Sequence, residues 1–266
     1  MIADGKQVAS LLKEQIINNL SKASQKKVCF IIFGNDPGSR QFINMKCRFA
    51  EGLGIKAIVS EHPENVTFTD VKRIIDEITL RNYSGIVIQL PLPKNLDTDQ
   101  VLNLVPVDLD IDVLSENAKR QYKLGQTDKV PPVSRAVEEI IKYHGIDLSD
   151  KKILIIGSGK LVGEPVSNML SMKKINYAQI DKNTDPTKKD ELLKTSDIII
   201  SGAGDSHFIK PDMIKEGVIL IDAGTSESEG KIVGDVDPDC FPKALLVTPV
   251  PGGVGPVTLS CLFLNI

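Results

Sequence analysis

The stretch Lys152-Ile-Leu-Ile-Ile-Gly157-Ser-Gly159-Lys-Leu-Val-Gly163-Glu-Pro165 decides the fold class of the second half of the chain. Its consecutive apolar residues are typical of a strand buried in a parallel sheet, and the glycines after them open a helix. Glycines at such a junction let backbone N–H groups face a pyrophosphate, so the stretch predicts a dinucleotide-binding turn. The spacing is one residue longer than the common fingerprint, and glycines here are equally compatible with an ordinary tight turn.

Strands and helices alternate on both sides of this stretch. The predicted strands are Val28–Phe33, Ile55–Val59, Gly85–Leu90, Ile153–Ile156, Tyr177–Ile180, Ile198–Ser201, Val218–Asp222 and Ala244–Val247. The predicted helices are Lys6–Leu20, a helix capped by Ser39 that runs towards Leu53, Asp70–Leu80, Ala136–Tyr143, Pro165–Lys173, Asp190–Leu193 and Pro211–Ile214. Residues 106–132 are polar and irregular, as expected for a connection between domains. The alternation predicts an α/β protein with parallel sheets and a Rossmann-like, doubly wound second half.

Composition narrows the possible functions. A chain of 266 residues, 41% of them hydrophobic, is long enough for two domains. The formal net charge is −3 and basic residues are scattered, which argues against nucleic acid as the main partner. Apolar runs are far shorter than the roughly 20 residues that cross a bilayer, and the N-terminus has no secretory pattern. We therefore expect a cytoplasmic protein without a membrane span.

Metal-binding and disulfide patterns are absent from the sequence. The four cysteines are widely spread, without a C-x-x-C pair: Cys29, Cys47, Cys240 and Cys261. The three histidines have no ligand-like spacing: His62, His144 and His207. We expect buried thiols and no metal.

Two further segments carry unusual turn chemistry. One is Gly85-Ile-Val-Ile-Gln89-Leu-Pro91-Leu-Pro93, an apolar strand that stops at a glutamine and two prolines. The other is Thr248-Pro-Val-Pro-Gly-Gly-Val-Gly-Pro-Val-Thr258, whose prolines and glycines predict a shaped loop rather than a helix or central strand. Together with the Gly157 turn, these segments resemble the bifunctional methylenetetrahydrofolate dehydrogenase/methenyltetrahydrofolate cyclohydrolase (FolD) family. The resemblance extends from about Ile2 to Leu264.

The resemblance implies a division of labour between two domains with a cleft between them. Residues 1–125, completed by a C-terminal helix within 257–266, would form the folate-binding catalytic domain, and 126–256 the NAD(P)-binding domain. The implied reaction is oxidation of 5,10-methylenetetrahydrofolate to the 5,10-methenyl form, followed by hydrolysis to 10-formyltetrahydrofolate. A homodimer in one-carbon metabolism, supplying purine biosynthesis, is also implied.

The resemblance assigns roles in the folate half residue by residue. Lys46 matches the lysine that handles protons, Gln89 the glutamine that orients it, and Asp112 the carboxylate that binds the pterin. Asp110 is a second match, because the alignment needs a one-residue insertion there. The other implied folate-binding residues are Ser39, Phe42, Leu90, Pro91, Pro249, Pro251, Gly252, Gly253, Gly255 and Pro256.

The cofactor half offers small residues at successive strand ends, where a doubly wound sheet binds ligands. The predicted cofactor-binding residues are Gly157, Ser158, Gly159, Val162, Gly163, Asp181, Lys182, Gly202, Ala203, Gly204, Gly224 and Thr225. Asp181 lies where a carboxylate accepts hydrogen bonds from the ribose of NAD and repels the 2′-phosphate of NADP. Many family members carry Arg in place of Ser158, but Lys182 can still hold a phosphate. We expect NAD or NADP, with NAD favoured.

Departures from the family pattern leave alternatives open. Phe42 stands where the family usually has Tyr, and Val113 where Gly is common. Hydride transfer depends on positioning and should survive loss of the Tyr hydroxyl better than a water-dependent step. The alternatives are a dehydrogenase with weak cyclohydrolase activity, another nicotinamide-dependent dehydrogenase of the same architecture, and a non-catalytic dinucleotide sensor.

Overall fold

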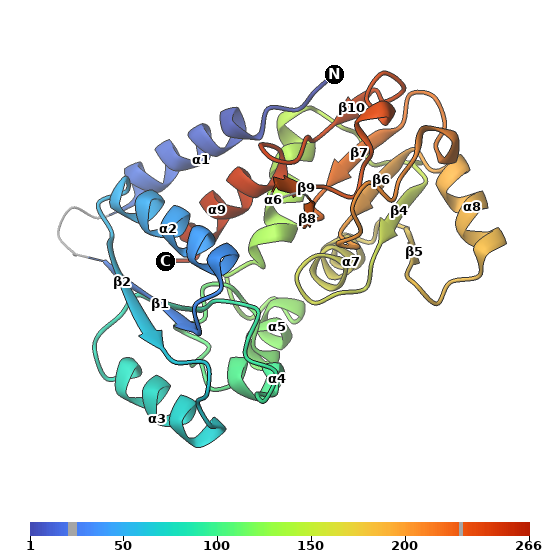
Figure 1. The fold of residues 1–266 in the computed structure, drawn as a ribbon. Coiled ribbons are helices and arrows are strands. Elements are labelled where there is room, and N and C mark those ends of the chain that lie inside the picture. The colour runs from blue at the N-terminus through green and yellow to red at the C-terminus, as the bar shows by residue number, and fades with distance from the viewer. Residues whose placement is uncertain (21–25, 229–230) are drawn as a thin grey trace. The chain divides into compact units, whose positions relative to one another are not determined.

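The structure, a computed structural model, describes residues 1–20, 26–228 and 231–266 (Figure 1). The chain divides into two compact units. The N-terminal unit comprises Lys13–Pro131 with Leu262–Ile266, and the C-terminal unit comprises Met1–Leu12 with Pro132–Cys261. The helices α1 (Gly5–Asn19) and α9 (Val254–Phe263) each contribute residues to both units. The predicted two-domain α/β architecture is confirmed, while the functional division at residue 125 stays a prediction.

A three-stranded parallel sheet forms the centre of the N-terminal unit. Its strands are β1 (Lys27–Phe33), β2 (Lys56–His62) and β3 (Gly85–Ile88), in the order β2-β1-β3. Because side chains alternate along a strand, Cys29, Ile31 and Phe33 share one face of β1. They pack with Val71 and Ile75 of α3 (Phe68–Thr79), which lies on that face of the sheet (Figure 1).

The helix α2 (Pro37–Glu51) follows β1 and carries several predicted folate-site residues. The expectation that Ser39 caps this helix is wrong. Asp36 is the cap, because its carboxylate accepts a hydrogen bond from the Ser39 backbone N–H at 2.7 Å and Pro37 occupies the first helical position. Ser39 therefore lies inside the first turn, where its side chain is buried.

The segment predicted as an irregular connection, 106–132, contains the helix α5 (Glu116–Lys123) and belongs to the N-terminal unit. Ser115 caps α5, and Ala118 and Tyr122 are buried with Val113. A second short helix, α4 (Thr98–Leu102), precedes it. Both helices are short and rich in polar residues, so few apolar positions mark them in the sequence.

A five-stranded parallel sheet forms the centre of the C-terminal unit, in the order β10-β7-β6-β4-β5. Its strands are β4 (Ile153–Ile156), β5 (Ala178–Ile180), β6 (Ile198–Ser201), β7 (Ile219–Asp222) and β10 (Leu246–Val247). The central strands β4, β6 and β7 are buried on both faces, as expected for a parallel sheet covered by helices.

Helices flank this sheet and connect its strands. They are α6 (Pro132–Tyr143), α7 (Gly163–Met172) and α8 (Pro186–Thr195). Leu193 of α8 packs with Leu154 and Ile156 of β4, whereas α6 and α7 pack against each other. The remaining elements are the antiparallel pair β8 (Ser226–Ser228) and β9 (Lys231–Val233) and the 3₁₀ turns η1 (Pro211–Met213) and η2 (Pro238–Cys240). The predicted helix at 211–214 is therefore a single 3₁₀ turn.

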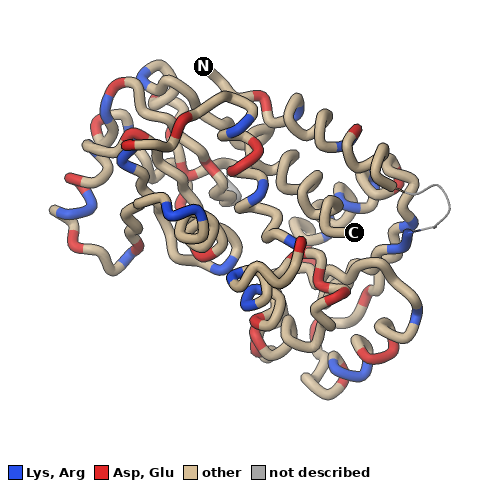
Figure 2. Tube along the Cα trace, turned by 180° about the vertical axis from the view of Figure 1, so that it is seen from behind, with Lys and Arg blue, Asp and Glu red and all other residues tan. Residues whose placement is uncertain are grey.

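Charge is mixed along both units. Figure 2 shows acidic and basic positions interspersed on the chain trace, as in the ion pairs Lys72–Asp76 and Arg73–Glu77 on α3. Among the described residues, no helix combines the length and the apolar character needed to span a membrane.

Candidate active site

The predicted catalytic residues of the N-terminal unit meet where its strand order changes direction. In the order β2-β1-β3, the chain leaves β1 for one side and returns on the other, so the ends of β1 and β3 are the switch point outside which open α/β sheets bind ligands. Gln89 directly follows β3, and its backbone N–H donates to the Ile31 carbonyl at 2.8 Å. Lys46 reaches the same place from α2, and its Nζ donates to Gln89 Oε1 at 3.0 Å. The side-chain amide of Gln89 in turn donates to the Leu90 carbonyl at 2.6 Å, which fixes its orientation.

Lys46 and Asp112 interact in a poorly hydrated environment. Burial lowers the pKa of Lys46 from its ordinary value of 10.5, and the attraction of Asp112 opposes that shift. Burial raises the pKa of Asp112, with Lys46 opposing the shift and Asp110 adding to it. Each group therefore favours the charged form of the other against the effect of burial. A lysine with a lowered pKa beside a carboxyl with a raised pKa suits acid–base chemistry.

The loop that carries Asp112 is closed by its neighbours. The buried Asp110 carboxylate accepts hydrogen bonds from the backbone N–H groups of Leu114 at 3.1 Å and Ser115 at 2.8 Å. Val113 has a φ of +55°, a conformation that glycine adopts without strain and a β-branched residue does not. The structure thus gives Asp110 a role inside the loop and leaves Asp112 as the carboxylate that interacts with Lys46.

A contact from the chain end also holds this loop, and the sequence reasoning missed it. Asn265, only 6% exposed, donates from Nδ2 to the carbonyls of Ile111 and Val130, both at 2.8 Å. Its Oδ1 accepts from the Val130 backbone N–H at 3.1 Å. A buried Asn with every polar atom paired fixes the backbone on the N-terminal side of Asp112. The only signal in the sequence was a polar residue among apolar ones near the chain end.

Two other predicted folate-site residues share α2 with Lys46. Ser39, Phe42 and Lys46 are spaced by three and four residues and therefore lie on one side of the helix. Phe42 is partly buried, and the Phe49 ring farther along α2 packs against Phe263 with ring centroids 5.4 Å apart. Leu90 packs at the edge of the sheet core, and Pro91 is exposed.

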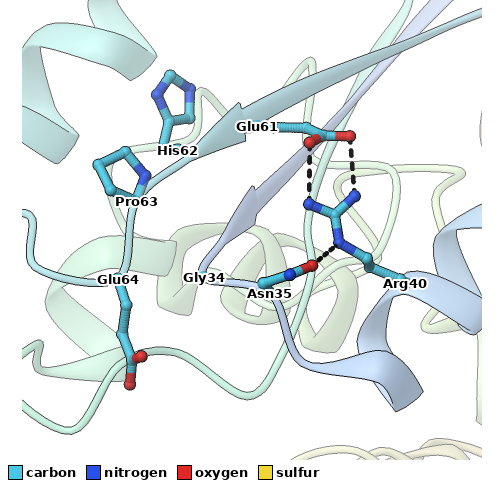
Figure 3. Close-up of a pocket in the computed structure, with 7 residues that line it drawn as sticks. All are labelled: Gly34, Asn35, Arg40, Glu61, His62, Pro63 and Glu64. Atoms are coloured by element: carbon cyan, nitrogen blue, oxygen red, sulfur yellow. Dashed lines mark hydrogen bonds and ion pairs between the residues drawn. The ribbon is translucent and has the colours of Figure 1, made fainter.

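A pocket of about 390 Å³ lies at the carboxyl ends of β1 and β2 (Figure 3). Its lining is Gly34, Asn35, Arg40, Glu61, His62, Pro63 and Glu64. Arg40 donates to both carboxylate oxygens of Glu61, at 3.1 and 2.9 Å, and to Asn35 Oδ1. Figure 3 shows the guanidinium held between these two residues, so three of its five N–H donors already have partners. No predicted site residue lines this pocket.

The glycines of the C-terminal unit make its strand ends approach closely. A Cβ on Gly163 would lie 2.2 Å from the Gly157 carbonyl oxygen, and one on Gly202 would lie 2.3 Å from Val162 Cβ. Gly157 has a φ of +98°, and its Cβ would lie 2.7 Å from the Gly202 carbonyl oxygen. In contrast, a Cβ on Gly159 would meet no atom within 4 Å. The glycines therefore join the ends of β4 and β6 and leave open space at Gly159.

These strand ends are the point where the sheet order reverses. The chain passes from β4 to the edge strand β5 and returns to β6 on the other side of β4. Ligands of doubly wound sheets bind outside such strand ends. The helix α7 begins at Gly163 without a side-chain cap. In its first turn the Glu164 N–H donates to the Gly159 carbonyl at 2.9 Å and Pro165 has no N–H, so the Gly163 N–H is the candidate donor to an anion.

Asp181 lies beside the Gly157 turn. Ser158 Oγ donates to Asp181 Oδ2 at 3.4 Å, and the other carboxylate oxygen accepts from the Asn183 backbone N–H at 2.9 Å. Lys182 is exposed next to it. The remaining predicted cofactor residues, Ala203, Gly204, Gly224 and Thr225, follow the ends of β6 and β7. The structure thus brings the predicted cofactor residues to one edge of one sheet.

The Pro249–Pro256 segment belongs to the C-terminal unit together with these strands. The Gly5 backbone N–H donates to the Gly252 carbonyl at 3.1 Å, and a Cβ on Gly5 would lie 1.8 Å from the Gly253 carbonyl oxygen. The expectation that no helix runs through 248–258 is wrong, because α9 begins at Val254. Pro256 fits its first turn, where a helix needs no N–H donor. Contacts of Pro249, Pro251 and Gly255 with a folate stay a prediction.

Models of one protein family match both halves of the chain. Residues 3–112 match the family model described as tetrahydrofolate dehydrogenase/cyclohydrolase, catalytic domain, and residues 131–266 match its NAD(P)-binding domain. The bifunctional protein FolD of Aquifex aeolicus is 34% identical over 273 residues, with 100% of this chain and 93% of the relative covered.

Two solved structures are similar over the full length. FolD methylenetetrahydrofolate dehydrogenase/cyclohydrolase from Campylobacter jejuni has a TM-score of 0.93 and 32% identity, covering 100% of this chain and 96% of its own. The Trypanosoma brucei enzyme, complexed with NADP and an inhibitor, has a TM-score of 0.91 and 28% identity, covering 100% and 95%. The resemblance inferred from the sequence is thereby confirmed. The chain belongs to the tetrahydrofolate dehydrogenase/cyclohydrolase family.

Proposed function

We propose that this protein oxidises 5,10-methylenetetrahydrofolate to 5,10-methenyltetrahydrofolate with NAD(P)⁺ and hydrolyses the product to 10-formyltetrahydrofolate. The observation that carries the proposal is the Lys46 Nζ to Gln89 Oε1 hydrogen bond of 3.0 Å, formed where the electrostatic attraction of Asp112 also acts on Lys46. An exposed structural lysine needs neither a buried amide partner such as Gln89 nor a nearby, partly buried carboxylate such as Asp112. Membership of the family supports the same two activities.

The residues of the N-terminal unit divide the work of hydrolysis. Water adds to the cationic methenyl carbon, and its oxygen becomes the formyl oxygen by losing both protons. One proton goes to the ring nitrogen as the bond from that nitrogen to the carbon breaks, and the other is released to solvent. Lys46, with its lowered pKa, takes up and returns the proton that goes to the ring nitrogen, and Gln89 holds its amine in place. Asp112 binds the amino and ring N–H groups of the pterin. Ser39, Phe42, Leu90 and Pro91 border the substrate. The folate-binding role of the loop from Pro249 to Pro256 rests on the family resemblance.

The C-terminal unit binds the dinucleotide, which accepts the hydride. When a dinucleotide binds, the Gly163 N–H at the start of α7 and the backbone around Gly159, where a Cβ would meet no atom within 4 Å, would hold its pyrophosphate. Gly202, Ala203, Gly204, Gly224 and Thr225 let the flat nicotinamide lie along the strand ends. The bound cofactor is NAD or NADP. NAD is favoured because the Asp181 carboxylate lies beside the Gly157 turn, and because position 158 is a serine and not the arginine that many family members have there.

Replacing Asp181 with Ser should shift the cofactor preference towards NADP. The carboxylate next to the Gly157 turn repels a 2′-phosphate, and Lys182 can attract one once that charge is gone. We expect the ratio of kcat/KM for NADP⁺ to that for NAD⁺ to rise about tenfold, because a repulsion of about 1.4 kcal/mol is a factor of ten. Asp190→Ser, which removes an exposed carboxylate of α8, is the matched control and should leave the ratio unchanged. An unchanged ratio in Asp181→Ser would contradict the assigned ribose contact.

Replacing Phe42 with Tyr should raise cyclohydrolase activity. Phe42 lies on the same side of α2 as Lys46. Its ring lacks the hydroxyl of the tyrosine that the family usually has here, so one hydrogen-bonding group that could pass a proton from water to Lys46 is missing. We expect kcat for hydrolysis of methenyltetrahydrofolate to rise about tenfold and kcat for dehydrogenation to change less than twofold. Both rates are measured on one preparation. Phe49→Tyr, one turn beyond Lys46 on α2, controls for the added hydroxyl, and equal effects of the two variants would refute the relay.

The phenylalanine at position 42 also favours a second candidate function, a dehydrogenase whose cyclohydrolase step is slow. A homodimer without nucleic-acid or membrane partners, in the cytoplasm and without a metal, completes the proposal. Among the described residues, no group of three or more His, Cys, Asp or Glu side chains is placed to hold a metal ion.

A two-signal assay tests the proposal. Wild-type protein is mixed with 5,10-methylenetetrahydrofolate and either NAD⁺ or NADP⁺, and absorbance of the reduced nicotinamide and of the methenyl group is followed separately. We expect reduced dinucleotide to form with both, faster with NAD⁺, and the methenyl signal to rise and then fall. A methenyl signal that persists supports the second candidate. Absence of reduced dinucleotide with either cofactor would refute both.

A further inference from the structure

Two buried aspartates in the C-terminal unit lie beneath the strand ends assigned to the dinucleotide. Asp235 is 0% exposed and Asp222 is 2% exposed. Neither belongs to the residues that the sequence assigns to catalysis or cofactor binding. Asp222 ends β7, and Asp235 follows the hairpin of β8 and β9.

The Asp235 carboxylate accepts three hydrogen bonds from the segment 201–205. Its Oδ2 accepts from Ser201 Oγ at 2.6 Å and from the Ala203 backbone N–H at 2.8 Å. Its Oδ1 accepts from the Asp205 backbone N–H at 2.9 Å. One carboxylate therefore shapes the whole turn after β6, including the glycines on either side of Ala203.

Asp222 ties the neighbouring strand end to the segment that carries Asp235. Its Oδ1 accepts from the Gly224 backbone N–H at 3.0 Å, and its Oδ2 from the Val236 backbone N–H at 2.9 Å. Its own backbone N–H donates to Thr248 Oγ1 at 2.7 Å. The ends of β7 and β10 and the segment around Asp235 are thus joined by side-chain hydrogen bonds.

Two glycines let the carboxylates approach the backbone this closely. A Cβ on Gly224 would lie 2.2 Å from Asp235 Oδ1, and a Cβ on Gly234 would lie 2.1 Å from Asp222 Oδ2. Both positions therefore require glycine, so the carboxylates and glycines form one interlocked arrangement. It lies directly behind Gly202, Ala203, Gly204 and Gly224.

The arrangement costs free energy that a purely structural contact would avoid. Burial and the nearby Asp235 raise the pKa of Asp222 to about 6. Apolar side chains of similar volume are often at least as stabilising as buried charges. Carboxylates do what apolar groups cannot, since they fix the direction of several backbone N–H groups at once.

We propose that Asp235, supported by Asp222, is a positioning residue that holds the turns after β6 and β7 in the conformation that a nicotinamide dinucleotide binds. The aspartates touch the turns and not the ligand, so they act through the backbone of Gly202–Gly204 and Gly224. The inference rests on the proposed use of NAD(P) and adds to it the residues that prepare the site.

Asp235→Asn in the full-length protein tests the proposal, because it keeps the shape and replaces one acceptor oxygen with a donor. Dissociation constants for NAD⁺ and NADP⁺ are measured by calorimetry, without folate. Binding and hydrolysis of 5,10-methenyltetrahydrofolate are measured without dinucleotide. We expect both dinucleotide dissociation constants to rise at least tenfold, while methenyltetrahydrofolate binding and hydrolysis stay within twofold of the wild type.

Two further variants keep the test decisive. Ser201→Ala removes one of the three hydrogen bonds, and we expect a rise of about threefold in the dinucleotide dissociation constants, even if Asp235→Asn does not fold. Asp190→Asn, an exposed carboxylate of the same unit, should change nothing. Unchanged dinucleotide affinity in both test variants would overturn the proposal, as would an equal loss of dinucleotide and folate binding.

The proposed reaction and the positioning role of Asp235 can be refuted independently of each other. A wild-type protein that binds dinucleotide without oxidising methylenetetrahydrofolate would refute the reaction, and the comparison of dissociation constants would still decide the positioning role. A wild-type protein that binds neither dinucleotide would overturn both.

Discussion

Lys46→Met should lose at least a hundredfold in cyclohydrolase kcat while its dissociation constant for folate changes less than threefold. Methionine has a similar length and keeps the apolar stem packed, but it removes the amine that donates to Gln89. Positioned acid–base groups typically contribute 10²- to 10⁴-fold to a rate, which sets the expected size. Dehydrogenation should fall less, because hydride transfer depends on alignment of the two substrates.

The pH dependence of cyclohydrolase activity tests the role of Lys46 independently. Burial lowers the pKa of Lys46 below 10.5, so the amine loses its proton at a lower pH than an exposed lysine does. Wild-type cyclohydrolase activity should therefore change with pH below 10.5, and that change should be missing from the residual activity of Lys46→Met. Lys72→Met, which removes an exposed lysine of α3, is the control. Hydrolysis in Lys46→Met at the wild-type rate and with the wild-type profile would refute the proton role.

Gly163→Ala should raise the dissociation constants for NAD⁺ and NADP⁺ at least tenfold and lower the melting temperature. The added Cβ would lie 2.2 Å from the Gly157 carbonyl oxygen and 2.9 Å from Ser158 Cα, so backbone rather than a flexible side chain must move. The displaced turn is the one that we propose binds the pyrophosphate. Overpacking of this kind typically costs 1–3 kcal/mol, and calorimetry with thermal denaturation measures both effects.

Gly159→Ala is the matched comparison for stability. Its Cβ would meet no atom within 4 Å, and its backbone does not adopt a positive φ. The melting temperature of this variant should stay within about 2 °C of the wild type, since exposed substitutions usually change stability by less than 0.5 kcal/mol. Equal melting temperatures for Gly163→Ala and Gly159→Ala would show that the close approach of Gly163 to Gly157 is not required.

The strands that carry the sites could be predicted from the sequence because short apolar runs that end at glycine are typical of buried parallel strands. The run Ile153–Ile156 is apolar throughout and Ile198–Ser201 is apolar up to its final serine, and glycine follows each one. Their strand bounds match the structure, and the order of the sheet then brings their ends together. Lys46 and Gln89 were likewise predicted, by resemblance, and the structure places them in hydrogen-bond contact.

What the sequence did not reveal depends on contacts between distant residues. The helix α5 is polar, and its burial of Tyr122 with Val113 is a tertiary contact that periodicity does not report. Asp235 looks like any acidic residue in a turn until Ser201, Ala203 and Asp205 are seen to donate to it. Asn265 joins segments more than a hundred residues away, for which the local pattern carries no signal.

Transfer of deuterium tests the central claim most directly. Methylenetetrahydrofolate deuterated at the bridging methylene carbon is incubated with the protein and NAD⁺, and the reduced dinucleotide is analysed by mass spectrometry. Because we assign the hydride donor to that carbon and the acceptor to the dinucleotide at the ends of β4 and β6, the reduced dinucleotide should carry one deuterium. Reduced dinucleotide without deuterium, or none formed with NAD⁺ or NADP⁺, would contradict the assignment.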